Sequence, residues 1–168
     1  MNNLTFENIL RFIGLVLLQV LVFNQIHLFD FIIPMVYIAW IFLFPVRKNK
    51  SLFLVLSFLL GLTVDFFSNS GGINAAATLF IAFIRLPILQ AVLRKSDFDY
   101  LLFNLRSIPF NKSLLFISIL TFIHHLIVFS LDYFSFNEFS TIIYNTILTS
   151  VFTIFIIILG ITLFTKRK

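Results

Sequence analysis

The amino-acid sequence predicts an all-α membrane protein, a bundle of six transmembrane helices. Three observations indicate this fold class. Of the 168 residues, 60% are hydrophobic and 25 are phenylalanine, which is more apolar surface than one aqueous core can bury. Charged residues make up 11% of the chain, whereas soluble domains carry roughly 25%. The charges also lie between uncharged stretches whose lengths suit membrane-spanning helices.

The uncharged stretches define the expected helices. A helix needs roughly 20 residues to cross a hydrocarbon core of about 30 Å. We therefore expect one integral membrane domain over residues 1–168, with helices near 10–29, 31–46, 51–68, 72–93, 113–131 and 140–164. The second of these is short for a membrane span. Runs such as 151–159 do not alternate apolar and polar residues, and this argues against the strands of a membrane β-barrel.

The basic residues predict the orientation, because cytoplasmic loops retain Lys and Arg near helix ends. Of the 12 basic residues, all except Arg85 fall on one side of the six expected helices. They are Arg11, Arg47, Lys48, Lys50, Arg94, Lys95, Arg106, Lys112, Lys166, Arg167 and Lys168. The opposite connections, at Asp30, 68–72 and 132–138, contain no Lys or Arg. We therefore expect both termini in the cytoplasm.

Residues 94–112 form the expected cytoplasmic connection between the fourth and fifth helices. Apolar residues recur there at helical spacing, and charged residues occupy the other directions. We expect an amphipathic helix that ends at Pro109. It either lies in the inner membrane interface, which is the more common arrangement, or binds a partner.

Asp65 and Arg85 are the charged residues expected at membrane depth, where an ionisable side chain is costly unless it is paired or faces a cavity. Three arrangements are open for Asp65. Its carboxylate accepts hydrogen bonds from the free N–H groups at the start of the next helix, forms an ion pair with Arg85, or faces water at the outer surface. Arg85 lies close to Pro87. It is either an interfacial arginine in a kinked helix or part of a buried site that engages a partner or substrate.

Small and polar residues predict where helices pack closely, since close backbone approach drives helix association in lipid. Ser57, Gly61 and Asp65 share one face of the third helix, Ala75, Thr78 and Ala82 one face of the fourth, and Asn145, Thr149 and Thr153 one face of the sixth. For each of these stripes, helix packing is favoured over contact with a ligand.

No pattern in the sequence indicates catalysis, a cofactor or a metal. Cysteine is absent, and no P-loop, dinucleotide-binding fingerprint or G-x-S-x-G motif occurs. His124 and His125 are adjacent, so on a helix they point about 100° apart and cannot easily bind one metal ion together. Asp65 with Arg85 is the one pair with which an intramembrane enzyme could work. We expect no catalytic residues, cofactor or metal, and no nucleic-acid partner.

Residues 61–77, GLTVDFFSNSGGINAAA, resemble the MreD family of rod shape-determining proteins. That family has a Gly-Leu-x-x-Asp-x-Phe element at the end of one span, followed by a turn in which glycine and small residues open the next span. The matching residues are Gly61, Leu62, Asp65, Phe67, Gly72, Ala75, Ala76 and Ala77. Chain length, short outer loops, a basic tail and residues 17–29 are similar to that family over essentially the whole chain.

The resemblance implies a non-catalytic component of the cell-elongation complex in the bacterial cytoplasmic membrane, which scaffolds or regulates peptidoglycan synthesis and cell shape. The implied partners are an MreC-like membrane-anchored protein and membrane lipid. An MreB-like filament, a RodA-type glycosyltransferase and a class B penicillin-binding transpeptidase are implied as direct or indirect partners.

The alternative is a substrate-binding membrane subunit of a vitamin or small-molecule transporter. MreD-like proteins are similar in fold to the substrate-binding subunits of energy-coupling-factor transporters. Those subunits carry an Ala-x-x-x-Ala element on the first helix that docks to their coupling subunit. Residues 15–23 contain no alanine, and this favours the scaffold.

Overall fold

The computed structural model describes residues 3–26, 32–46, 50–94, 108–134 and 138–164. These residues form helices joined by short connections, without a strand. The elements are α1 (Asn3–Leu21), the 3-10 helices η1 (Phe23–Gln25) and η2 (Val36–Ile38), α2 (Ala39–Leu43), α3 (Ser51–Ser68), α4 (Ile73–Leu93), α5 (Phe110–Tyr133) and α6 (Phe139–Phe164).

Within the described ranges, five helical segments are long and apolar enough to cross a membrane. They are Phe6–Gln25, Ser51–Ser68, Ile73–Leu93, Phe110–Tyr133 and Phe139–Leu163. Large apolar side chains remain on the outside of the bundle; for example, Phe66 is 82% exposed and Leu163 is 69% exposed. A lipid environment solvates such side chains, whereas water does not. The expected all-α fold and its transmembrane helical character are therefore supported.

The expectation of a membrane-length helix over residues 31–46 is wrong. Residues 32–46, which we call the central segment, are not helical before Val36, form η2 and the five-residue α2, and are extended at Phe44. Pro34 and Pro45 account for this, because each lacks an N–H group and disfavours helical backbone in the preceding residue. Extended residues advance about 3.3 Å each, against 1.5 Å in a helix, so a segment that is only partly helical covers more length than a helix with the same number of residues.

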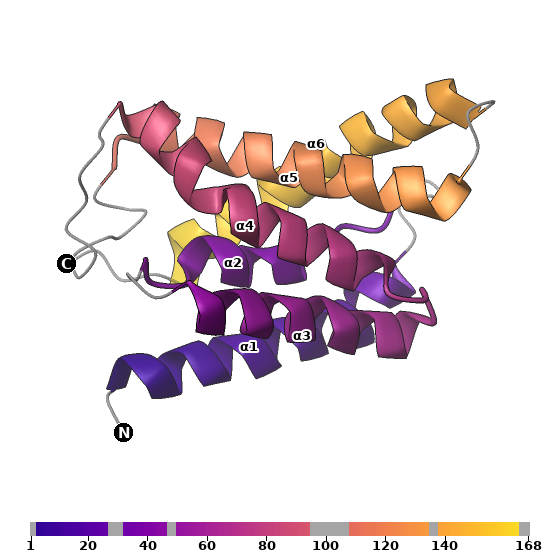
Figure 1. The fold of residues 1–168 in the computed structure, drawn as a ribbon. Helices are drawn as coiled ribbons and strands as arrows, with labels where there is room; N and C mark the ends of the chain where they lie inside the picture. The colour runs from indigo at the N-terminus through magenta and orange to yellow at the C-terminus, as the bar shows by residue number, and fades with distance from the viewer. Residues whose placement is uncertain (1–2, 27–31, 47–49, 95–107, 135–137, 165–168) are drawn as a thin grey trace.

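The central segment forms the core of the bundle (Figure 1). Trp40 is 1% exposed, and its ring lies 5.6 Å from that of Phe12 in α1 and 6.1 Å from that of Phe53 in α3. Phe42 is fully buried, 6.1 Å from the ring of Phe116 in α5. Helices from both halves of the chain therefore pack around a segment that is itself only partly helical.

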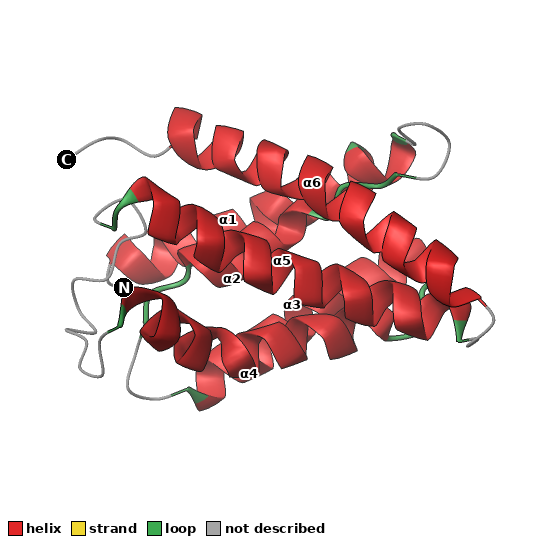
Figure 2. Cartoon of the chain, turned by 90° about the horizontal axis from the view of Figure 1, so that it is seen from above, coloured by secondary structure: helices red, strands yellow, loops and turns green. Residues whose placement is uncertain are grey.

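Consecutive long helices lie beside one another, and α5 lies between α4 and α6 when the bundle is seen from above (Figure 2). The start of α1 and the end of α6 lie at the same end of the bundle (Figure 1). The start of α3, the end of α4 and the start of α5 lie at this same end (Figure 1), and the sequence has Lys50, Arg94 and Lys112 at or beside these helix ends. This arrangement is the one expected for an even number of crossings. The cytoplasmic location of this end stays a prediction, and residues 95–107 of the expected amphipathic helix lie outside the described residues.

Candidate functional site: a buried polar network

A segment that is not helical leaves backbone N–H and C=O groups unpaired inside the bundle. In hydrocarbon each such group costs several kcal/mol, so irregular backbone occurs at membrane depth only where protein groups satisfy it. Side chains from α1, α4 and α6 do this for the central segment. We call these side chains, together with the hydrogen-bonded groups that continue from them, the polar network.

Gln19 of α1 satisfies the beginning of the central segment. Its Oε1 accepts hydrogen bonds from the backbone N–H groups of Val36 and Tyr37, at 2.8 and 3.4 Å. Its Nε2 donates to the carbonyl of Pro34 at 3.1 Å. The side chain is 1% exposed. One glutamine therefore supplies the partners that a regular helix would have supplied along this stretch.

Thr153 of α6 completes this part of the network. Its hydroxyl oxygen accepts a hydrogen bond from the N–H of Met35 at 3.2 Å and lies 3.1 Å from Nε2 of His125. The other ring nitrogen of His125 lies 2.8 Å from the carbonyl oxygen of Thr121, one turn earlier in α5. His125 thus connects α5 and α6 to the central segment.

Arg85 of α4 satisfies the end of the central segment. Its guanidinium donates to the carbonyl oxygen of Phe42 at 3.2 Å and to that of Phe44 at a shorter distance. The guanidinium carbon also lies 5.1 Å from the ring centroid of Phe53, in a cation–π contact. Arg85 is 3% exposed. Of the two interpretations open for it, the structure shows a buried residue that binds backbone carbonyls of the same chain.

Asp65 adopts the first of its three expected arrangements. Its carboxylate accepts hydrogen bonds from the backbone N–H groups of Asn74 and Ala75, at 2.9 and 2.7 Å, and from the hydroxyl of Ser70. The carboxylate therefore caps the N-terminus of α4, where the helix dipole favours a negative charge. Asp65 is 4% exposed, so neither exposure to outer water nor an ion pair with Arg85 describes it.

The turn between α3 and α4 depends on its glycines. Gly71 and Gly72 have φ values of 64° and 95°, in the left-handed region that favours glycine. The side-chain amide of Asn74 also donates to the Asp65 carboxylate, at 3.0 Å. The turn therefore folds back so that the end of α3 and the start of α4 share one set of hydrogen bonds, which we call the hairpin tie.

Gly61 lets α3 and α4 approach closely one turn before Asp65. A Cβ atom at this position would lie 2.5 Å from the carbonyl oxygen of Asn74 and 2.6 Å from Cα of Ala75. Such backbone contacts cannot be relieved by moving a flexible side chain. Leu62 and Phe67 of the same motif point elsewhere, with 42% and 57% of their surface exposed. Gly61, Asp65, Gly72 and Ala75 thus build the hairpin, and Leu62 and Phe67 face outward.

A chain of hydrogen bonds joins the hairpin tie to the middle of the bundle. The hydroxyl of Tyr37 donates to Oδ1 of Asn74 at 2.8 Å and lies 3.1 Å from Nε2 of His124. Asp65, Asn74, Tyr37 and His124 therefore connect α3, α4, the central segment and α5. His124 and His125 bind different partners on different helices, as adjacent helix positions require.

The predicted stripes of small and polar residues also lie inside the bundle. Ser57 and Thr78 are fully buried and donate to carbonyl groups one turn earlier in their own helices, at 2.7 Å in each case. Asn145 of α6 donates to the hydroxyl of Tyr133 at the end of α5, at 2.9 Å. These contacts agree with the packing interpretation.

Three members of the polar network, Gln19, Tyr37 and Asn74, were not among the expected site residues. The available signal was a polar side chain within an otherwise apolar stretch, which usually bonds inside the bundle. Gln19 lies 17 positions from Val36, and Tyr37 lies 37 positions from Asn74 and 87 from His124, so the sequence alone does not pair them.

The fold and the network define the class of protein: a multi-pass helical membrane protein whose polar side chains hold a partly extended segment at the centre of the bundle. Within the described residues, no three His, Cys, Asp or Glu side chains are placed to hold a metal ion together. No family model, curated protein or solved structure matches the chain.

Proposed function

We propose that this protein is a non-catalytic membrane component of the bacterial cell-elongation complex, a scaffold or regulator of the MreD type. It acts in the cytoplasmic membrane through an MreC-like partner. The MreB-like filament, the RodA-type glycosyltransferase and the class B penicillin-binding transpeptidase join the same assembly directly or indirectly. Membrane lipid surrounds the bundle.

One observation carries this proposal: the segment that resembles the MreD family is also the segment that ties α3 to α4. Gly61 permits the close approach of the two helices, and Asp65 caps α4. The motif therefore has a physical reason for its residue types and spacing. A rigid hairpin of this kind suits a protein whose task is to present fixed helix faces to membrane partners.

The surroundings of the charged residues support a role without catalysis. Asp65 is engaged by backbone N–H groups of α4, and Arg85 by backbone carbonyls of the central segment. A catalytic acid or base needs a reacting group within hydrogen-bonding distance. Both residues instead bind backbone, which is a structural task.

The proposal is tested by co-expressing the tagged full-length protein with an MreC-like protein and purifying the pair in a mild detergent. We expect the two to co-elute. Asp65→Ala should lower the recovery of the partner, measured per amount of monodisperse protein. Asp132→Ala is the matched control, because Asp132 is exposed near the end of α5.

A different result would favour the transporter alternative. If the protein binds a vitamin tightly and co-purifies with a coupling ATPase while the MreC-like protein is lost, the scaffold proposal is refuted. Equal recovery of the MreC-like protein by wild type and Asp65→Ala would refute the assigned role of the hairpin tie.

A further inference from the structure

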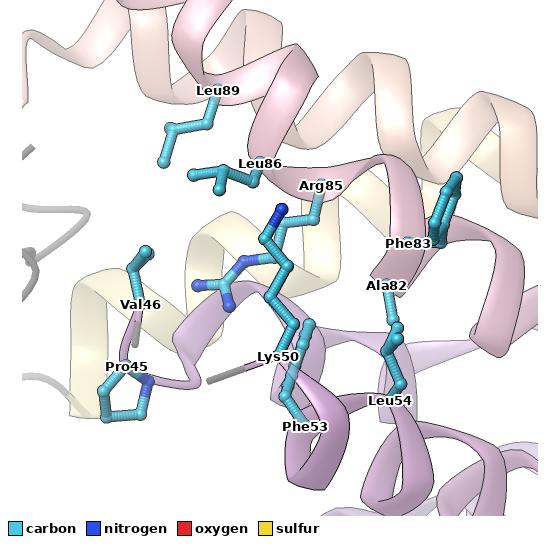
Figure 3. A pocket seen from close by; sticks show the side chains of 10 residues that line it. All are labelled: Pro45, Val46, Lys50, Phe53, Leu54, Ala82, Phe83, Arg85, Leu86 and Leu89. Atoms are coloured by element: carbon cyan, nitrogen blue, oxygen red, sulfur yellow. The ribbon is translucent and has the colours of Figure 1, made fainter. Parts of the chain in front are cut away.

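A cavity of about 80 Å³ opens beside Arg85 at the basic end of the bundle (Figure 3). The end of the central segment, the first turn of α3 and the second half of α4 form its walls. One water molecule needs roughly 10–15 Å³ of such volume, so the cavity holds a group several times larger. It is therefore large enough for a small polar headgroup.

The cavity has a cationic interior. Arg85 and Lys50 both line it, and the lining residues, all in the described part of the chain, include no Asp or Glu. The Nε atom of Arg85 is buried and has no hydrogen-bond partner among the described residues, although Nη2 of the same guanidinium donates to two carbonyls. A buried N–H donor without an acceptor is costly. The arginine that lines the cavity therefore has one donor without an acceptor, and an anion beside it would offset the buried positive charge.

The first turn of α3 adds the dipole of a helix N-terminus to the same place. Lys50 is the residue that precedes this helix, and its side chain makes no capping hydrogen bond. The dipole of this 18-residue helix favours an anion beside its first turn. Figure 3 shows the side chains of Lys50 and Phe53 rising from this turn beside the Arg85 guanidinium.

The rest of the wall is apolar and opens toward the outside of the bundle. Leu86 and Leu89 line the cavity from α4, and Phe83, which is 67% exposed, lies at its edge. A free inorganic anion makes no use of such a wall, whereas the hydrocarbon chain of a lipid packs against it. We infer that this cavity binds the phosphate headgroup of an anionic membrane lipid, held by Arg85, Lys50 and the first turn of α3.

The test is native mass spectrometry of the full-length protein in a neutral detergent, titrated with phosphatidylglycerol. Parallel titrations use diacylglycerol, which lacks the phosphate, and inorganic phosphate, which lacks the hydrocarbon chains. We expect one phosphatidylglycerol to bind more tightly than either. Lys50→Glu should weaken this binding by about tenfold or more, since it replaces a cationic contact by a repulsive charge. Lys50 is exposed, so the variant should fold.

Lys112→Glu is the matched control, because Lys112 lies at the same end of the bundle, in the first turn of α5, and does not line the cavity. It should bind phosphatidylglycerol like the wild type. Equal binding by Lys50→Glu and wild type would overturn the inference, as would diacylglycerol binding as tightly as phosphatidylglycerol. Inorganic phosphate that binds as tightly as the lipid would assign the cavity to a free anion instead.

Discussion

Replacing Gln19 by methionine removes the partners of the central segment while keeping an unbranched side chain of similar length. The change leaves the N–H groups of Val36 and Tyr37 and the carbonyl of Pro34 without the bonds that Gln19 makes at 2.8, 3.4 and 3.1 Å. Each buried unsatisfied group costs about 1–3 kcal/mol. The 3.4 Å bond is weak, so we count two groups and expect a loss of about 2–6 kcal/mol.

The assay measures the apparent melting temperature in a neutral detergent. The signal is the amount of monodisperse protein that survives heating. At roughly 2–4 °C per kcal/mol for a chain of this size, Gln19→Met should melt roughly 4–24 °C below the wild type. Gln25→Met is the control, because Gln25 is exposed at the end of η1. The reasoning is refuted if Gln19→Met melts at the same temperature as the wild type, or if Gln25→Met lowers the melting temperature by as much as Gln19→Met does.

Two further variants test the α3–α4 hairpin by the same melting assay. Gly61→Ala should cost about 1–3 kcal/mol, because the new methyl group meets backbone atoms of α4. Gly160→Ala, where a Cβ has nothing within 4 Å, should not destabilise the protein, and similar melting of the two variants would contradict the close approach. Asp65→Ala should cost about 2–6 kcal/mol, because it leaves two buried N–H groups at the start of α4 without an acceptor. Asp132→Ala should melt at the same temperature as the wild type. An equal fall in melting temperature in both Asp variants would argue against the hairpin tie.

The helical fold follows from local features of the sequence, and most of it was predictable. Apolar stretches with few charges mark the five long helices, because a lipid-exposed helix must be largely apolar along its length. Among the described residues, Lys50, Arg94 and Lys112 mark one end of the bundle, at or beside the ends of α3, α4 and α5. The spacing of Gly61 and Asp65 in α3 placed both on the face that meets α4, and the turn glycines indicated a tight connection. The residues of this hairpin lie close together in the chain, so the local sequence is enough to predict how they pack.

The central segment shows where this reasoning fails. An apolar stretch without charge is compatible with a helix and with an extended chain, and only Pro34 and Pro45 distinguish the two here. Whether such a segment is tolerated depends on groups that reach it from other helices. Gln19 and Arg85 supply those groups across 15 to 43 positions of sequence. Non-local hydrogen bonds of this kind have no signature in local periodicity.

The position of the central segment also explains why Gln19, Thr153 and Arg85 lie inside the bundle, where each bonds its backbone. Irregular backbone requires donors and acceptors, and these in turn must be held in place. Arg85 meets the end of the segment, and its partly unsatisfied guanidinium faces the cavity beside α3. A lipid headgroup bound there would therefore act directly on the residue that holds the segment in the bundle.

The central claim is that residues 32–46 lie inside the bundle, and the single tryptophan of the chain, Trp40, reports on it directly. The measurement is quenching of tryptophan fluorescence by brominated lipid in reconstituted vesicles. As a reference, a Trp40→Phe, Phe83→Trp variant places the only tryptophan on the exposed face of α4. The account predicts much weaker quenching of Trp40 than of this reference. Equal quenching would show that the segment faces lipid, as an ordinary transmembrane helix does, and would contradict the account.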